Sequence, residues 1–154
     1  MNNLCRRVLR ALQGKTLVTA ESCTGGGIGA ALTAIPGSST VYKGGVICYT
    51  NWVKENILGV DREVLDRYGA VSLPVAEYMA DGVRELLKAD IAVSVTGLAG
   101  PDGDEFGHEV GTVYIGYCSA PKAVTKKFLF SGNRESIRNQ AIVAALEMII
   151  EYNT

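Results

Sequence analysis

Three polar side chains stand in a row near the N-terminus, in the stretch TAESCTGGGIGA. The hydroxyl of Ser22, the thiol of Cys23 and the hydroxyl of Thr24 directly precede four glycines within five residues. A turn from a strand into a helix exposes the residue at the strand end, so either Ser22 or Cys23 is placed to act as a nucleophile. Free N–H groups at the helix entrance, from Thr24, Gly25 or Gly26, would then stabilise a developing oxyanion.

A nucleophile of this kind needs a base, and the sequence offers two candidates. His108, the single histidine, lies in the acidic, glycine-flanked loop DGDEFGHEVG. Lys54 follows the run VICYTN and lies in the first turn of a predicted helix, where the helix dipole and partial burial lower the pKa of an amine. A neutral lysine accepts a hydroxyl proton in serine–lysine catalysis. Tyr49, at the end of the same run, is placed to relay that proton or to orient the lysine.

The glycines themselves also match G-x-G-x-x-A, a loose dinucleotide-binding pattern. That pattern requires an acidic residue about 20 positions further on, and residues 42–50 contain none. The phosphate-loop signature G-x-x-x-x-G-K-[ST] is absent as well. We therefore interpret the glycines as a packing device that lets the helix lie close to its neighbours.

The composition excludes several classes of protein. With 47% hydrophobic and 20% charged residues and a net charge of −1, the chain is typical of a globular domain and shows no basic stripe for nucleic acid. No apolar segment is long enough to cross a membrane, and the N-terminal residues do not resemble a secretory signal. The four cysteines form no C-x-x-C pair, which argues against structural zinc. We expect a cytoplasmic protein that binds neither nucleic acid nor membrane.

Apolar periodicity predicts alternating helices and strands. Predicted helices cover residues 4–12, 25–35, 51–58, 61–68, 72–88 and 133–152, and predicted strands cover residues 16–20, 45–49, 91–95, 111–118 and 124–130. This order predicts one domain over residues 1–154, with an α/β fold: a three-layer α/β/α sandwich around a mixed central sheet. The loops ESCTGG, YTNWVK and TGLAGPDG leave strand ends, and parallel strands would bring them together at one edge.

Six blocks of the sequence carry a resemblance to a known family. TAESCTGGGIGAALTAIPGSS, GGVICYTNWVKENILGV, GAVS, SVTGLAGPDG, VGTVYIGY and FSGNRESIRNQA occur in this order over nearly the whole chain. Together they resemble the CinA C-terminal-domain family, the nicotinamide-nucleotide amidohydrolases. The resemblance implies an enzyme that hydrolyses the carboxamide of nicotinamide mononucleotide (NMN) to nicotinate mononucleotide and ammonia in pyridine-nucleotide recycling, with no metal or organic cofactor. It also implies the stand-alone form, without the N-terminal nucleotide-binding region of fused members.

The resemblance assigns the catalytic roles by position. It makes Ser22 the nucleophile, and Tyr49 and Lys54 the pair that activates it. Cys23 remains a rival nucleophile, because a thiolate is intrinsically more reactive than a hydroxyl. The pairing with lysine suits a hydroxyl better, so we favour Ser22.

The resemblance also implies a set of substrate-binding positions. Arg134 and Arg138 of the block GNRESIR are the expected phosphate ligands, and their i, i+4 spacing places both on one face at the start of the last helix. The full expected set is Cys23, Thr24, Gly25, Gly26, Ser39, Asn51, Thr96, Gly97, Arg134 and Arg138.

Two alternative functions stay open at this point. The chain could be a non-catalytic nucleotide-sensing module of the competence-damage-inducible type, which binds NMN without turnover. It could instead be a metal-assisted hydrolase that uses His108 with Asp102, Asp104 and Glu105 or Glu109, although a glycine-containing loop of this kind is more simply a lid. Small-residue faces and exposed apolar helices also predict a homo-oligomer, most simply a homodimer.

Overall fold

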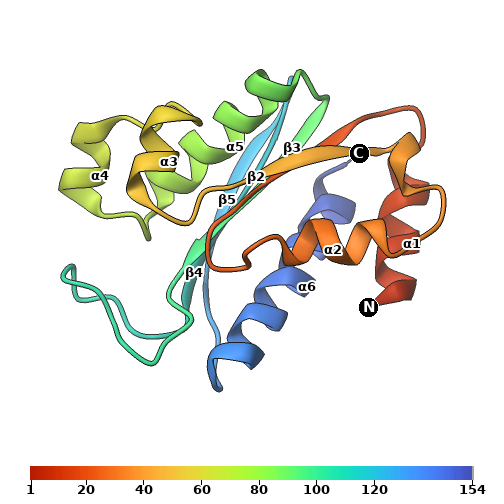
Figure 1. Cartoon of the computed structure of the whole chain (residues 1–154). Coiled ribbons are helices and arrows are strands. Elements are labelled where there is room, and N and C mark those ends of the chain that lie inside the picture. Colours follow the sequence, from red (N-terminus) through yellow and green to blue (C-terminus); the bar gives the residue numbers. More distant parts are fainter. Residues whose placement is uncertain (154) are drawn as a thin grey trace.

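A five-stranded sheet in the order β2-β1-β3-β4-β5 forms the centre of the computed structural model, which describes residues 1–153 (Figure 1). The strands are β1 (Leu17–Glu21), β2 (Tyr42–Ile47), β3 (Ile91–Gly97), β4 (Thr112–Ser119) and β5 (Ala123–Leu129). β1 runs parallel to both β2 and β3, whereas β4 and β5 are each antiparallel to the preceding strand. The predicted mixed sheet is confirmed, and the carboxyl ends of the three parallel strands share one edge.

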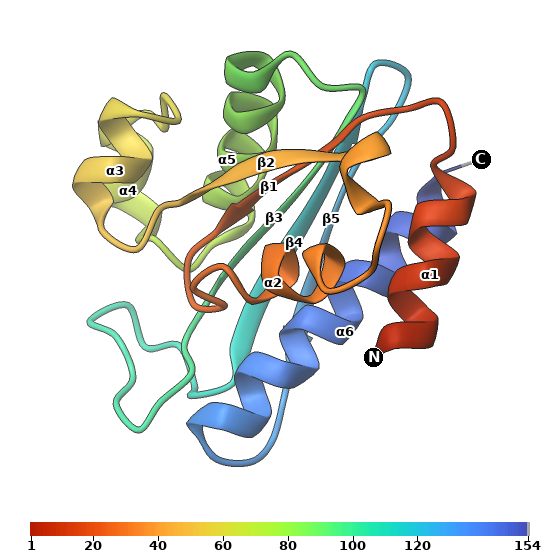
Figure 2. The same ribbon diagram turned by 45° about the vertical axis from the view of Figure 1, so that its right-hand side comes forward.

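Helices cover both faces of this sheet. α1 (Asn2–Ala11), α2 (Gly27–Thr33) and α6 (Arg134–Tyr152) lie on one face, and α3 (Asn51–Asn56), α4 (Arg62–Tyr68) and α5 (Leu73–Leu87) lie on the other (Figures 1 and 2). A short 3-10 turn, η1 (Ser38–Thr40), precedes β2. This arrangement confirms the three-layer sandwich. Within residues 1–153, no helix has both the length and the apolar character needed to cross a membrane.

Two hydrophobic clusters, one on each face, hold the layers together. In β3, Val93 belongs to the cluster under α1, α2 and α6, and its neighbour Ala92 belongs to the cluster under α5. In β1, Leu17 belongs to the cluster under α1, α2 and α6, and Val18 belongs to the cluster under α5. This alternation follows from the two-residue period of a strand, and it explains why β1 and β3 are buried along almost their whole length.

Several element boundaries differ by two or three residues from the sequence-based expectation, and glycines explain two of them. β2 begins at Tyr42, three residues before the predicted start, because Gly44 and Gly45 weaken the strand signal. Gly45 is required there, since a Cβ atom at this position would overlap the Thr19 side chain of β1. α2 begins at Gly27, two residues later than predicted, because Gly25 and Gly26 have φ values of +58° and +95° that a helix does not use.

A contact between α5 and the chain after α3 fixes the position of α3. A Cβ atom added at Gly82 in α5 would overlap the carbonyl group of Leu58.

Alanine normally stabilises a helix interior over glycine by about 1 kcal/mol. At Gly82 we expect the opposite: Gly82→Ala should lower the free energy of unfolding by about 1–3 kcal/mol, because backbone must move. Urea denaturation measures this change, and Glu85→Ala at an exposed position of the same helix is the control. An unchanged or increased stability of Gly82→Ala would contradict the close packing.

Candidate active site

Ser22 and Lys54 meet at the carboxyl-terminal edge of the parallel strands. Ser22 directly follows β1, and its N–H donates to the carbonyl of Val95 in β3 at 2.9 Å. Lys54 lies in α3, whose first turn is capped by the Thr50 hydroxyl, one of the two predicted caps. The Lys54 Nζ atom lies 3.0 Å from the Ser22 Oγ atom and 2.5 Å from the Cys48 carbonyl oxygen. The sequence placed Ser22 and Lys54 in one site, and the structure brings them into hydrogen-bonding contact.

Burial sets the protonation of the Lys54 amine. The side chain is only 1% exposed, and within residues 1–153 it forms no ion pair with a carboxylate. Burial lowers the pKa of Lys54 below its usual 10.5, against smaller opposing effects of Cys48 and Cys23. A neutral amine that donates to the Cys48 carbonyl presents its lone pair to the Ser22 hydroxyl. Nucleophile, base and orienting group thus form a continuous hydrogen-bonded series.

Cys23 has the opposite electrostatic environment. It is 5% exposed, and burial raises the pKa of its thiol to about 11. The thiol therefore stays protonated near neutral pH, and the Lys54 amine hydrogen-bonds to Ser22 and the Cys48 carbonyl, not to the Cys23 thiol. This environment favours Ser22 over Cys23 as the nucleophile.

A cavity of about 410 Å³ opens above the Ser22–Lys54 pair. Residues from the loops after β1, β2 and β3, from the α4–α5 turn and from the start of α6 form its walls. Its lining consists of Ser22, Cys23, Tyr49, Asn51, Lys54, Ala70, Val71, Thr96, Gly97, Leu98, Ala99, Gly100, Pro101, Asp102 and Arg134. Of the expected substrate-binding residues, Cys23, Asn51, Thr96, Gly97 and Arg134 therefore line one cavity.

The rim of the cavity carries Tyr49 and Arg134. The Tyr49 hydroxyl accepts a hydrogen bond from Arg134 Nη2 at 2.9 Å, and Arg134 Nη1 donates to the Gly100 carbonyl at 2.6 Å. Tyr49 is 58% exposed and, among the described residues, does not hydrogen-bond to Lys54 or Ser22. The expected pairing of tyrosine with lysine is therefore not present, because the ring extends toward the rim. Arg134 instead holds the tyrosine and supplies a cation at the cavity mouth.

A second buried ionisable side chain, Glu21, anchors one side of the turn formed by residues 22–26, which we call the nucleophile turn. Its carboxylate accepts hydrogen bonds from the Thr24 hydroxyl at 2.8 Å and from the N–H groups of Ile28 and Gly29 at 2.8 and 3.1 Å. The sequence analysis did not identify Glu21 as a functional residue. A carboxylate just before a helix entrance is the signal that could have found it, because it complements the free N–H groups and the helix dipole.

Several residues expected to bind substrate lie outside the cavity lining. The Thr24 hydroxyl faces Glu21 instead. The Gly25 N–H donates to the Ser22 carbonyl at 3.0 Å and is not free for an oxyanion. Gly26 lies against Ile47. Ser39 lies exposed in η1, which precedes β2 and so lies at the opposite edge of the sheet.

Arg138 has a different position from the one expected of a phosphate ligand. Its Nε atom donates to the Cys23 carbonyl at 2.9 Å, and its Nη2 atom donates to the Thr24 carbonyl at 3.2 Å. The guanidinium is thus bound to the backbone of the nucleophile turn, and Arg138 does not line the cavity. Its i, i+4 partner Arg134 lies at the cavity mouth, so the two arginines have separate surroundings.

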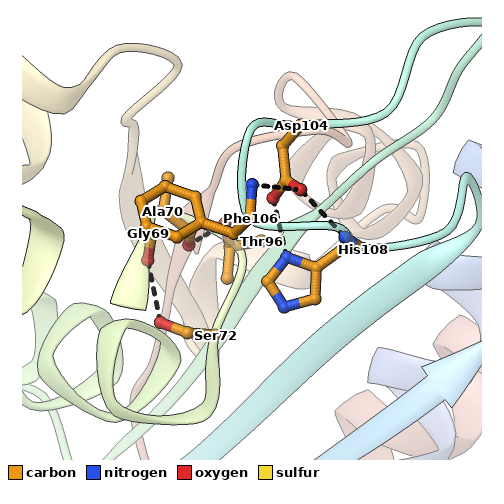
Figure 3. A network of polar contacts seen from close by, with 7 residues as sticks. All are labelled: Gly69, Ala70, Ser72, Thr96, Asp104, Phe106 and His108. Atoms are coloured by element: carbon orange, nitrogen blue, oxygen red, sulfur yellow. Dashed lines mark hydrogen bonds and ion pairs between the residues drawn. The ribbon is translucent and has the colours of Figure 1, made fainter. Parts of the chain in front are cut away.

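The acidic loop forms a self-contained structure between β3 and β4 (Figure 3). The Asp104 carboxylate accepts the N–H groups of Phe106 and His108 at 3.2 and 3.0 Å and lies 2.7 Å from Nδ1 of His108. Among residues 1–153, no three His, Cys, Asp or Glu side chains are placed to share a metal ion. The loop therefore does not assemble the ligand set that the metal-assisted alternative requires.

The same loop rests on the turn between α4 and α5. The Phe106 ring packs against Gly69, where an added Cβ atom would lie 2.6 Å from Cδ2 of the ring. Below this contact, the Thr96 hydroxyl donates to the Ala70 carbonyl at 2.8 Å and the Ser72 hydroxyl donates to the Gly69 carbonyl at 2.9 Å (Figure 3). The loop thus packs on the α4–α5 turn, and its first residues, Pro101 and Asp102, line the cavity.

The lowered pKa of Lys54 predicts a pH-dependent stability. Between the folded and unfolded pKa values, the unfolded chain binds more protons, so stability rises with pH. As the pH rises toward 10.5, the free energy of unfolding of the wild type should therefore rise relative to Lys54→Met, by at most about 1.4 kcal/mol per pH unit. Urea denaturation at several pH values measures this difference. Lys43→Met is the matched control for loss of an exposed amine. A difference that does not change with pH would contradict a buried, neutral Lys54.

Comparison with known proteins gives matches over the whole described chain. The CinA C-terminal domain family matches residues 1–153. A CinA-like protein of Parasynechococcus marenigrum is 44% identical over 153 residues, which cover 96% of this chain and 36% of the relative. A CinA-like protein of Endomicrobium trichonymphae is 47% identical over 135 residues, covering 88% and 32%. The chain thus spans about a third of the length of these curated relatives.

Solved structures show the same architecture. A competence-damaged protein (CinA) superfamily protein from Klebsiella pneumoniae has a TM-score of 0.96 and 37% identity, with coverage of 99% of this chain and 96% of that protein. A competence/damage inducible protein from Agrobacterium tumefaciens also has a TM-score of 0.96, with 39% identity and coverage of 99% and 95%. The family match, the identities and the shared fold agree with the resemblance carried by the six sequence blocks, and the chain belongs to the CinA C-terminal domain family.

Proposed function

We propose that this protein is an amidohydrolase that converts NMN to nicotinate mononucleotide and ammonia. The observation that carries the proposal is the 3.0 Å contact between Ser22 Oγ and the buried Lys54 amine at the base of a cavity. This is the arrangement of a serine nucleophile with a lysine base, and it lies within the range over which a proton transfers directly. The choice of a nicotinamide nucleotide as substrate rests on the resemblance of the six sequence blocks to the nicotinamide-nucleotide amidohydrolases.

Acylation would begin with proton transfer from the Ser22 hydroxyl to neutral Lys54. The Oγ atom forms a bond to the carboxamide carbon, and the carbonyl oxygen becomes an oxyanion. When the tetrahedral intermediate collapses, the C–N bond breaks and Lys54 returns its proton to the leaving nitrogen. Ammonia departs, and a nicotinoyl ester remains on Ser22. The Cys48 carbonyl keeps the amine directed at the reacting atoms throughout.

Deacylation would repeat these steps with water as the nucleophile. Lys54 takes a proton from water, and the hydroxide oxygen bonds to the ester carbon. The bond to Ser22 Oγ then breaks, the proton returns to the serine, and the nicotinate carboxylate is released. A single base therefore serves both half-reactions, because its pKa is low enough for it to be neutral and to be regenerated.

The dimensions and charge of the cavity agree with a mononucleotide. A volume of about 410 Å³ is within the usual range for small-ligand sites. Arg134 at the mouth offers a guanidinium to the 5′-phosphate, a ligand that arginine recognises through paired N–H groups. The distance from mouth to base would separate the phosphate from the carboxamide at Ser22.

Ammonia release from NMN tests the proposed reaction directly. Ser22→Ala should lower kcat by on the order of 10³-fold or more, and Lys54→Met by on the order of 10²- to 10⁴-fold, because nucleophile and base are lost. Wild-type kcat should rise with pH as Lys54 loses its proton and should level off below the usual lysine pKa of 10.5. Equal ammonia release by wild type and Ser22→Ala would refute the proposal. Calorimetric binding of NMN without turnover would instead support the nucleotide-sensing alternative.

The position of Arg134 predicts an effect on substrate binding. Arg134→Met removes the cation at the mouth, so KM for NMN should rise about 10-fold or more with a smaller change in kcat, as expected for a charge-assisted contact worth about 1.5–3 kcal/mol. The same variant should have little effect on nicotinamide riboside, which lacks the phosphate. An equal rise in KM for both compounds would contradict a phosphate-binding role.

A further inference from the structure

Arg138 is a half-buried cation whose hydrogen bonds, among residues 1–153, go to the backbone carbonyls of Cys23 and Thr24. It extends from α6, which lies beside α2 on one face of the sheet (Figure 2). We propose that Arg138 is a positioning residue that holds this turn so that the Cys23 N–H group stabilises the oxyanion of acyl transfer. This inference rests on the proposed amidohydrolase function and deepens it.

The geometry connects Arg138 to the Cys23 amide through two peptide groups. In a planar trans peptide, the N–H and C=O bonds point in opposite directions. Arg138 binds the Thr24 carbonyl, and the N–H on the far side of that peptide, from Gly25, donates to the Ser22 carbonyl at 3.0 Å. The Ser22 carbonyl in turn belongs to the Ser22–Cys23 peptide, and the N–H on the far side of that peptide is the one of Cys23. Fixing the Thr24 carbonyl therefore fixes the direction of the Cys23 N–H.

The Cys23 N–H has the properties expected of an oxyanion donor. Within residues 1–153, no carbonyl or side chain of another residue accepts a hydrogen bond from this N–H, although most buried N–H groups are paired. It belongs to a residue that lines the cavity and directly follows Ser22. The amide directly after the nucleophile is a recurrent oxyanion donor in acyl-transfer enzymes. The Gly25 N–H, expected from the sequence to play this part, is already bound to Ser22.

Arg138 also prevents the peptide between Cys23 and Thr24 from turning to the opposite orientation. Within residues 1–153, it is the single hydrogen-bond partner of the Cys23 carbonyl, whereas the Thr24 carbonyl also accepts the Gly27 N–H at 2.9 Å. Without the guanidinium, the Cys23 carbonyl is free to rotate and to place a partial negative charge near the reacting centre. A charge-assisted hydrogen bond to this carbonyl opposes that rotation.

The glycine that follows the turn makes room for this contact. Gly25 has a φ of +58°, and an added Cβ atom would lie 3.3 Å from Arg138 Nη2. On the other side, Glu21 holds Thr24 and the α2 amides. The turn is thus held between a buried carboxylate and a guanidinium, and of these two groups the guanidinium is the one that contacts the carbonyls of Cys23 and Thr24.

Kinetics of matched arginine variants test the inference. Arg138→Met should lower kcat for NMN by on the order of 10- to 100-fold, somewhat less than loss of an oxyanion donor itself, with KM within about 2-fold of wild type. Arg134→Met in the same helix should show the reverse pattern. Arg138→Lys, which retains a cation but cannot span both carbonyls, should have an intermediate kcat. A raised KM with unchanged kcat for Arg138→Met would overturn the inference and make Arg138 a phosphate ligand.

A probe that does not depend on NMN separates this inference from the proposed function. A fluorophosphonate reacts with an activated serine through a transition state that needs the same oxyanion donor. Labelling of Ser22, verified by its loss in Ser22→Ala, should be on the order of 10-fold slower in Arg138→Met and near the wild-type rate in Arg7→Met, which removes an exposed arginine of α1. If NMN is not hydrolysed but labelling still depends on Arg138, the substrate assignment fails and the inference stands. Equal labelling rates of Arg138→Met, Arg138→Lys and wild type would overturn it, and Arg138→Lys decides the matter if Arg138→Met does not fold.

Discussion

The structure depends on one unusual constraint, which is an amine buried without a counter-ion. Lys54 is among the largest fully buried side chains, and its ammonium form would be strongly destabilised there. Burial lowers the pKa of this amine, and the amine has two hydrogen-bond partners, the Cys48 carbonyl and the Ser22 hydroxyl. The Thr50 cap and the close contact of Gly82 with Leu58 then hold α3 where these bonds are possible. A stable fold and an activated serine thus follow from the same arrangement.

Glu21 is a buried carboxylate directly before Ser22 in the chain, and it forms no ion pair with Lys54. It is buried on the far side of Ser22 and binds the Thr24 hydroxyl and the N–H groups of Ile28 and Gly29. Backbone donors at a helix entrance stabilise a carboxylate without any cation. The two buried ionisable groups are therefore kept apart, one satisfied by α2 and the other left to face the nucleophile. A direct Glu21–Lys54 ion pair would hold the amine in its charged form and remove the base.

The sequence predicted the elements and the central pair but not the detailed contacts. Apolar periodicity and capping residues locate the helices and strands because they depend on local physics. Ser22 and Lys54 were found because strand ends of parallel strands share an edge. The direction of the Tyr49 ring and the backbone contacts of Arg138 depend on how α6 crosses that edge, which no local pattern encodes. The role of Glu21 was missed because its partners lie in the following helix and become visible only when the turn is closed.

The two arginines of α6 illustrate what spacing alone leaves open. Four residues along a helix correspond to about 6 Å, so side chains on one face can reach different neighbours when the helix passes an edge obliquely. Arg134 reaches the rim, where it binds Tyr49 and the Gly100 carbonyl, and Arg138 reaches the turn behind Ser22. In the proposed reaction, the substrate phosphate needs the cation that Arg134 offers at the rim, and the oxyanion needs the backbone turn that Arg138 holds. In the proposed mechanism, the same residue type therefore serves ground-state binding at one position and backbone orientation at the next turn, and the surrounding acceptors, not the sequence motif, decide which.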